Sequence, residues 1–170
     1  VKSPEYIELL KEVSQDISNE SKKAENEASI VSIFELELFS FIKENLGLKY
    51  YPEKEKAINT ERHISKGRID SKIGALVIEF KHTSKLIKPV HKQKASSQLI
   101  DYLKGLATKD NLDYYGIVTD GTQCKFITIE NGIINEGAFE KLSSKHLDTI
   151  IKDIVLLDKV ALTPENLVKD

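Results

Sequence analysis

A short apolar run, Ala75-Leu76-Val77-Ile78, leads directly into the charged pair of Glu79-Phe80-Lys81. An apolar run of this length with β-branched residues predicts a strand buried in a sheet. Residues two apart in a strand point to the same face, so Glu79 and Lys81 are expected to project side by side. Unpaired charge in a buried strand is expensive. This context favours a functional pair, and the alternative is a solvated Glu-Lys pair on an exposed strand.

Hydrophobic spacing predicts further elements on both sides of this strand. Helical patterns cover about residues 3–18, 25–45, 94–108 and 146–159. Strands are expected at about residues 50–59, 64–70, 73–81, 114–119 and 125–130, with the second and third forming a hairpin. Gly47 is a plausible helix stop, Pro89 is expected in a loop, and Asp120-Gly121 and Asn131-Gly132 are turn signals. The order predicts an α/β fold with a mixed central sheet flanked by helices.

At 170 residues the chain fits a single domain, expected over residues 1–160. Residues 161–170 are expected to begin a linker to a further domain. No apolar run approaches the roughly 20 residues of a membrane span, and no signal peptide opens the chain. Cys124, the single cysteine, is expected in the core, and no cysteine-histidine spacing for zinc occurs. We therefore expect a cytoplasmic protein without a membrane partner.

Charge is distributed unevenly along the chain, although the net charge is only −2. Residues 54–94 contain eleven Lys or Arg and four Asp or Glu, a local balance of +7. A basic segment in an otherwise acidic chain suggests one face for a polyanion, and the alternative is a solvated lysine-rich surface. Lys66, Arg68 and His82 are candidate DNA contacts within it, against the alternative of simple surface residues.

Asp70 stands nine residues before Glu79, where a short hairpin would bring it back alongside Glu79 and Lys81. Two carboxylates at a strand end form a hard oxygen site suited to Mg²⁺, with Mn²⁺ as a substitute, and the Phe80 carbonyl is a possible further ligand. A structural metal site has no use for an ammonium group beside it, whereas phosphodiester hydrolysis does. Lys81 can orient the attacking water or stabilise negative charge on the phosphate.

The helix at residues 25–45 carries an apolar stripe, with Glu27 near its middle and Glu35 and Glu37 on its flanks. Glu27 is therefore a candidate acid for the site, with Glu35 as the alternative. The alternative is that Glu27, in the first turn, serves only the helix dipole. Gln98 and Tyr102, four residues apart, share a helix face from which both could reach DNA phosphate, the attacking water or Glu79. The alternative for this pair is ordinary helix-surface residues.

These residues resemble the PD-(D/E)xK phosphodiesterase superfamily. The motifs are Gly67-Arg68-Ile69-Asp70, Val77-Ile78-Glu79-Phe80-Lys81, Gln98-Leu99-Ile100-Asp101-Tyr102 and Tyr115-Gly116-Ile117-Val118-Thr119-Asp120-Gly121. The resemblance spans about residues 27–132 and implies a restriction-endonuclease-like αβββαβ core. It also implies metal ligands at Asp70 and Glu79, a catalytic lysine at Lys81, a helix acid at Glu27 and an accessory motif at Gln98 and Tyr102. Ile69 replaces the proline of the family name.

The expectation is a magnesium-dependent DNA endonuclease domain, part of a restriction–modification or phage-defence protein. Its expected partners are DNA and covalently attached methyltransferase, helicase or recognition domains beyond Asp170. One alternative is an exonuclease or junction-resolving nuclease on the same fold. Another is a catalytically silent DNA- or partner-binding domain.

Overall fold

A computed structural model describes residues 3–46, 53–57, 68–73 and 75–161 of the chain, with side chains described for residues 3–45 and 75–153. The helical elements in these ranges are α1 (Pro4–Ser21), α2 (Glu27–Phe34), the π-helical turn η1 (Glu35–Phe39), α3 (Ser40–Leu46), the 3-10 turn η2 (Thr83–Lys85), α4 (Pro89–Asp110) and α5 (Ser144–Ala161). The strands are β1 (Glu53–Ala57), β2 (Arg68–Ile73), β3 (Leu76–Phe80), β4 (Tyr114–Thr119), β5 (Gln123–Glu130), β6 (Ile133–Glu136) and β7 (Glu140–Lys141).

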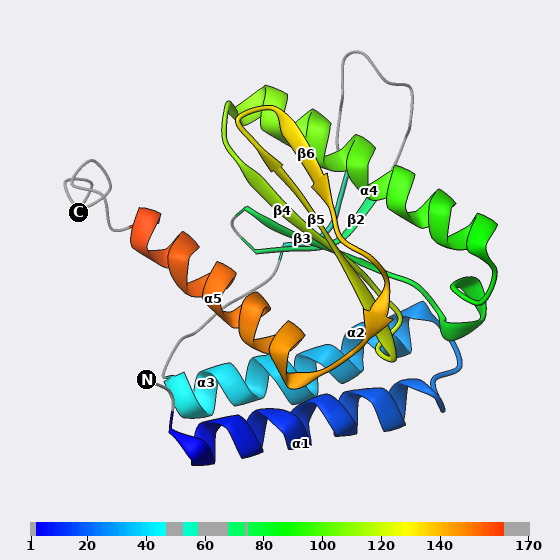
Figure 1. The fold of residues 1–170 in the computed structure, drawn as a ribbon, viewed down its shortest axis with the longest axis vertical. Helices are drawn as coiled ribbons and strands as arrows, with labels where there is room; N and C mark the ends of the chain where they lie inside the picture. Colours follow the sequence, from blue (N-terminus) through cyan, green and yellow to red (C-terminus); the bar gives the residue numbers. More distant parts are fainter. Residues whose placement is uncertain (1–2, 47–52, 58–67, 74, 162–170) are drawn as a thin grey trace.

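The described strands form one mixed sheet in the order β1-β2-β3-β4-β5-β6, with the short β7 also paired to β5. Strands β3 and β4 are parallel, and every other pairing in this sheet is antiparallel. Parallel neighbours need a long crossover, and α4 supplies it between β3 and β4 (Figure 1). The predicted α/β fold with a mixed sheet flanked by helices is therefore confirmed.

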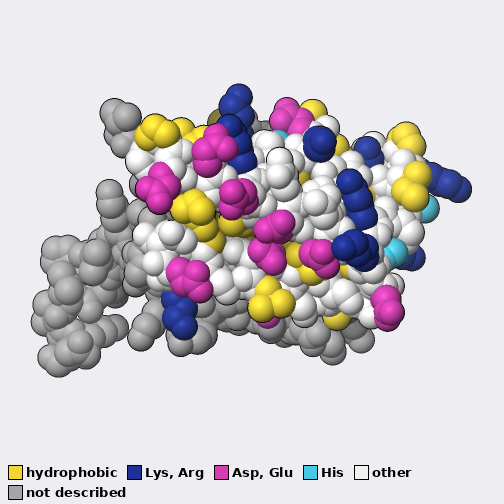
Figure 2. Space-filling view, turned by 90° about the horizontal axis from the view of Figure 1, so that it is seen from below, with side chains coloured by type: hydrophobic (Ala, Val, Ile, Leu, Met, Phe, Trp, Pro, Cys, Tyr) yellow, Lys and Arg dark blue, Asp and Glu magenta, His cyan; other side chains and the backbone are white. Residues whose placement is uncertain are grey.

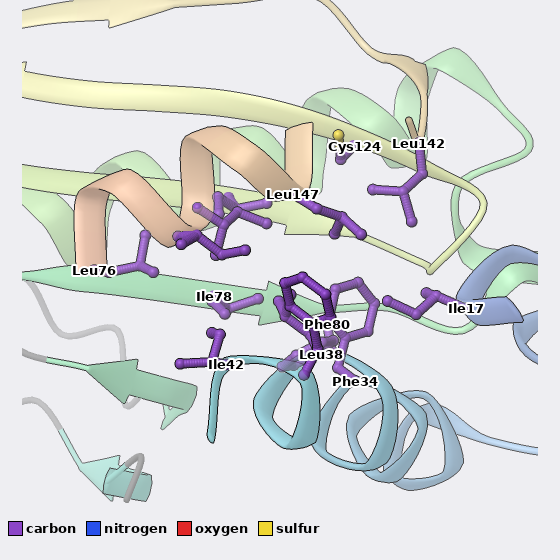
Figure 3. Close-up of a cluster of buried hydrophobic side chains, with 14 of the residues drawn as sticks. Ile17, Phe34, Leu38, Ile42, Leu76, Ile78, Phe80, Cys124, Leu142 and Leu147 are labelled. Carbon is purple, nitrogen blue, oxygen red and sulfur yellow. The ribbon is translucent and has the colours of Figure 1, made fainter. Parts of the chain in front are cut away.

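Helices cover both faces of the middle of the sheet. On one face, alternate residues of β3 pack against α1, α2, α3 and α5, as Figure 3 shows for Leu76, Ile78 and Phe80. The ring of Phe80 meets that of Phe34 edge to face, with centroids 5.2 Å apart. On the other face, Val77 joins an apolar cluster built mainly by α4, β4 and β5. Strand β3 is buried along its whole length for this reason.

The N-terminal helices begin where the sequence supplies caps. Ser3 accepts a hydrogen bond from the Tyr6 N–H at the start of α1, and Asn26 accepts one from the Ser29 N–H at the start of α2. The predicted helix over residues 25–45 is confirmed as α2, η1 and α3 in succession. Its π-helical turn is a rare feature that places one additional residue in the helix.

One expectation about local structure was wrong. Pro89 lies in the first turn of α4 and not in a loop, because a proline there removes only an N–H that has no helical acceptor. Gly116 has a packing role within the β4–β5 hairpin, where it lies opposite Ile127. It lies within β4, where an added Cβ would come 2.8 Å from Leu103 Cδ1 and 2.9 Å from Leu99 Cδ2. The missing side chain allows α4 to approach the sheet closely.

The sheet extends further than expected, and its hairpin is displaced. Strands β6 and β7 were not predicted, although the turn at Asn131 and Gly132 was, and both residues adopt positive φ. The first hairpin arm, expected at residues 64–70, is β2 at Arg68–Ile73, so Asp70 lies inside a strand. Gly47, residues 50–52 and residues 58–67 lie outside the described residues.

A candidate active site at the end of strand β3

Glu79 is a buried acid in a strand that is otherwise apolar. It is 1% exposed, and it lies between Ile78 and Phe80, which face the cluster of α1, α2 and α5. Because side chains alternate along a strand, Glu79 belongs to the face covered by α4. A charged group at this depth requires a charged or hydrogen-bonding partner.

Lys81 is that partner, and it connects Glu79 to α4. Its Nζ lies 2.8 Å from Glu79 Oε1, with side chains 18% and 2% exposed respectively. The same ammonium donates a long hydrogen bond of 3.4 Å to Gln98 Oε1. The Gln98 Nε2 then donates to the Tyr102 hydroxyl at 2.9 Å. The structure thus links Glu79, Lys81, Gln98 and Tyr102 in one continuous polar chain, which we call the Glu79–Lys81 group.

The amide orientation of Gln98 follows from its two neighbours. Lys81 can only donate, so it must meet the amide oxygen, and the amide nitrogen then faces Tyr102. Tyr102 is 3% exposed, which fixes its ring within the α4 cluster. The expected shared face of Gln98 and Tyr102 is therefore confirmed, and the structure gives both residues a partner.

The Glu79–Lys81 group lies where two parallel strands end. The Lys81 N–H donates to the Thr119 carbonyl at 2.9 Å, so the chain leaves β3 beside the last residue of β4. Crevices at the carboxyl ends of strands in α/β sheets are the usual places for ligand binding. This is therefore a suitable location for a reacting group.

Asp120 is a second buried acid at this end, but its hydrogen bonds show a structural role. It is 1% exposed, and its Oδ1 accepts from the Thr122 N–H at 2.8 Å and the Gln123 N–H at 3.0 Å. The Gln123 Nε2 donates both to Asp120 Oδ2 and to the Leu86 carbonyl. Asp120 thus closes the β4–β5 turn that the sequence predicted and ties it to the segment after η2, as Asp side chains do in turns.

Asp70 is placed by backbone register. In the antiparallel β2–β3 pair, Ser71 lies opposite Ile78 and Lys72 opposite Val77. Continuing this register by one position brings Asp70 opposite Glu79. The side chain of Asp70 lies outside the described part of the structure. The recorded pairing ends at Ser71 and Ile78, so the expected juxtaposition of Asp70 and Glu79 stays a prediction one position beyond it.

The donor chemistry around Glu79 suits a hard divalent cation. A carboxylate has about four lone-pair positions, so the ammonium on Oε1 does not exhaust it. Among residues with described side chains, no group of three His, Cys, Asp or Glu is arranged to hold a metal. A metal would thus rely on Glu79 and Asp70 with waters and substrate oxygens, the pattern that Mg²⁺ favours. Phe80, whose carbonyl was a candidate ligand, lies opposite Thr119 in the β3–β4 pair.

The helix acids lie on the opposite face of the sheet. Glu27 is half-buried in the first turn of α2, where a carboxylate interacts favourably with the helix dipole. The helix of Glu27 packs on the face of β3 that carries Phe80, whereas Glu79 is on the other. Glu35 opens the π-helical turn with Oε1 buried. The position of Glu27 therefore fits a role at the helix dipole.

The three candidate DNA contacts have different outcomes. Lys66 lies outside the described residues, and Arg68 begins β2 with its side chain outside them. His82 is described, and both ring nitrogens are engaged. Its Nε2 is 2.8 Å from the Ala24 carbonyl, and its Nδ1 accepts from the Ser84 N–H at 3.3 Å. His82 therefore joins the end of β3 to the α1–α2 turn.

Comparison with known proteins gives no match to a family model, a curated protein or a solved structure. Over the described residues, no helix has both the length and the apolar character needed to cross a membrane. The case for a function therefore rests on the residues of the site.

Proposed function

We propose that this chain is a metal-dependent nuclease domain that hydrolyses DNA phosphodiester bonds at the Glu79–Lys81 group. The observation that carries the proposal is the buried ion pair between Glu79 and Lys81, held against Gln98 at the ends of two parallel strands. The order of the described elements also supports it. Helix, three strands, helix and parallel strand is the arrangement implied by the resemblance to PD-(D/E)xK enzymes.

Each residue of the group has a distinct task in this proposal. Glu79 and Asp70 would hold Mg²⁺ or Mn²⁺, which polarises the phosphoryl oxygen and lowers the pKa of a bound water. Lys81 orients the attacking water or stabilises the charge that grows on the phosphate. Gln98 and Tyr102 are positioning residues, because they fix the ammonium without touching the reacting atoms. Such fixed orientation can lower the activation free energy of the reaction by several kcal/mol.

The test is cleavage of supercoiled plasmid in Mg²⁺, comparing wild type with Lys81→Met. The matched control is Lys104→Met, an exposed lysine of α4 beyond the site. Wild type and the control are expected to nick the circle at equal rates, and Lys81→Met at least 100-fold more slowly. Circular dichroism at the assay temperature verifies that each variant is folded.

The substrate form separates the candidate activities. An endonuclease cuts the closed circle, whereas degradation of linear DNA alone would replace the endonuclease with an exonuclease. Wild type that cuts neither form faster than Lys81→Met would overturn the catalytic proposal. A role in binding DNA or a partner without chemistry would then stand in its place.

A further inference from the structure

One end of the molecule is strongly basic, and no acid interrupts it along the chain. From Phe80 to Ile100 there are five lysines and two histidines, and no Asp or Glu. These residues form the end of β3, η2 and the first half of α4. The exposed basic side chains among them are Lys85, Lys88, His91 and Lys94, which we call the basic end. Figure 2 shows Lys, Arg and His side chains gathered toward the right-hand end of the face it presents.

The basic end continues directly into the Glu79–Lys81 group. At 100° per residue, His91, Lys94 and Gln98 fall on one stripe of α4, and Tyr102 continues it. Gln98 contacts Lys81, whereas Lys94 one turn earlier is exposed. The stripe therefore runs from solvent into the site along a single helix.

Two large apolar side chains lie among these charges. Ile87 is 72% exposed and Val90 is 66% exposed, three residues apart at the start of α4. Lys85 and Lys88 are exposed neighbours of Ile87 and Val90 in the chain, so charged and apolar groups are available side by side to a bound molecule. The first turn of α4 contains no acid, and its N-cap residue Lys88 makes no side-chain cap. The helix dipole therefore adds to the positive potential at this end of α4.

The neighbouring turn between α1 and α2 limits this surface on one side. His82 ties the two together through the Ala24 carbonyl. Beyond that bond, Lys23 is paired with Glu20 at 3.1 Å, and Glu25 is exposed. Among the described side chains, a polyanion therefore meets positive charge along the first half of α4 and mixed charge toward α1.

We propose that the basic end is the surface on which duplex DNA lies, its phosphates paired with Lys85, Lys88 and Lys94, as the backbone enters the Glu79–Lys81 group. Ile87 and Val90 contact the sugar edges between these phosphates. This inference rests on the proposed nuclease function and adds the surface that delivers the substrate. The contacts are to the backbone, so binding is independent of sequence and falls steeply with salt.

The test is fluorescence anisotropy of a labelled 24-bp duplex with the full chain in Ca²⁺, measured from 50 to 300 mM NaCl. The variant is Lys85→Ala/Lys88→Ala/Lys94→Ala. The matched control removes the same charge elsewhere, by Lys43→Ala/Lys104→Ala/Lys109→Ala, all exposed. The basic-end variant is expected to bind at least tenfold more weakly at 100 mM salt. The plot of log K against log salt should also become less steep, with the magnitude of its slope smaller by about 3, roughly one per lysine. The control should match wild type.

The outcomes separate this inference from the proposed function. If wild type binds DNA through the basic end but never nicks it, the catalytic proposal fails and the surface stands. If wild type nicks and the basic-end variant nicks and binds as well as the control, the surface is wrong and the catalytic proposal stands. Binding of phosphatidylserine vesicles without binding of the duplex would assign the basic end to a lipid surface and overturn the inference.

Discussion

Glu79 lies in β3 and Lys81 directly follows the end of that strand, with Lys81 Nζ 2.8 Å from Glu79 Oε1 and side chains 18% and 2% exposed. A buried ion pair of this kind contributes little net stability, because desolvation of both groups offsets their attraction. Removing one member is costly, since the other charge then loses its partner. Changing both residues together therefore separates the contribution of the pair to folding stability from its proposed role in catalysis.

A double-mutant cycle on this pair is expected to show strong coupling. Lys81→Met should destabilise the fold by about 3 kcal/mol, because it takes the ammonium from the Glu79 carboxylate. The double variant Glu79→Gln/Lys81→Met should be about 2 kcal/mol more stable than the sum of the single changes predicts. Urea unfolding followed by circular dichroism gives these values. Plasmid nicking should stay absent in the double variant, so that stability returns without activity. Strictly additive effects on stability would show that the two charges are not coupled.

Asp153 of α5 makes the stability of the fold depend on pH. Burial, and then the nearby Glu130, raise its pKa from 3.8 to about 6. Between about pH 4 and pH 6 the unfolded chain has lost this proton while the folded chain still holds it, so stability falls as pH rises through that window. Asp153→Asn should therefore have a higher Tm than wild type at pH 7.5. At pH 3.5 the two proteins should have nearly the same Tm. Thermal unfolding at both pH values measures this. The exposed Asp101→Asn is the control, and an equal gain in Tm at both pH values would contradict the assignment.

At the scale of elements, α4 has two roles that depend on one glycine. Leu99 and Leu103 pack directly on Gly116 of β4, and Gln98 and Tyr102 on the same helix hold Lys81. The Gln98–Lys81 hydrogen bond is already long at 3.4 Å. Small outward movement of α4 would therefore break it before the fold itself is lost.

Gly116→Ala should both destabilise the fold and slow the reaction. The added methyl group would overlap two fully buried leucines, which costs about 1–3 kcal/mol in a well-packed core. Displacement of α4 should also reduce nicking about tenfold or more, because the site needs close positioning. Denaturant unfolding and plasmid nicking measure the two effects. The double variant Gly116→Ala/Leu103→Val should recover part of the stability and part of the nicking rate. If the losses of the two single variants simply add in the double variant, the overlap is not their cause.

Much of this arrangement of elements follows from hydrophobic spacing alone. The apolar run before Glu79, the stripe over residues 25–45 and the strand at Tyr114–Thr119 were all recognisable because they are long or strongly apolar. Strand β6 was missed because a partly exposed edge strand of four residues has little apolar pattern. The beginning of α4 was missed because the signal of Pro89 is the same for a loop and for the first turn of a helix. A π-helical turn has no sequence signal of this kind.

The candidate site was predictable in its residues but not in its geometry. The spacing placed Glu79 beside Lys81, and Gln98 beside Tyr102, because the members of each pair are only two or four residues apart in the chain. The hydrogen bond from Lys81 to Gln98 spans seventeen residues, and its formation depends on how α4 packs on β4. Glu27 was expected near the middle of an apolar stripe, and the buried residues of that stripe face the other side of β3. Which face of a sheet a helix covers is a property of the whole fold.

At the scale of the whole molecule, two apolar clusters enclose β3 and β4 from opposite sides. The Glu79–Lys81 group lies within one of these layers. A ligand that binds the group therefore also stabilises the folded domain. A cation bound to the folded site but not to the unfolded chain raises the free energy of unfolding of the entire domain. Thermal stability is therefore a measure of the proposed metal site that does not depend on activity.

Addition of 10 mM MgCl₂ is expected to raise the Tm of wild type. A site with a dissociation constant of about 1 mM would stabilise the folded state by roughly 1.4 kcal/mol, which corresponds to about 3–5 °C in a domain of this size. Glu79→Gln and Asp70→Asn should each abolish the shift, because both carboxylates are needed to hold the ion. Differential scanning calorimetry against NaCl of equal ionic strength measures it, and Asp101→Asn should keep the full shift. A shift that survives Asp70→Asn would mean that the register of β2 and β3 does not bring this carboxylate to the metal, and the site would then need another acid.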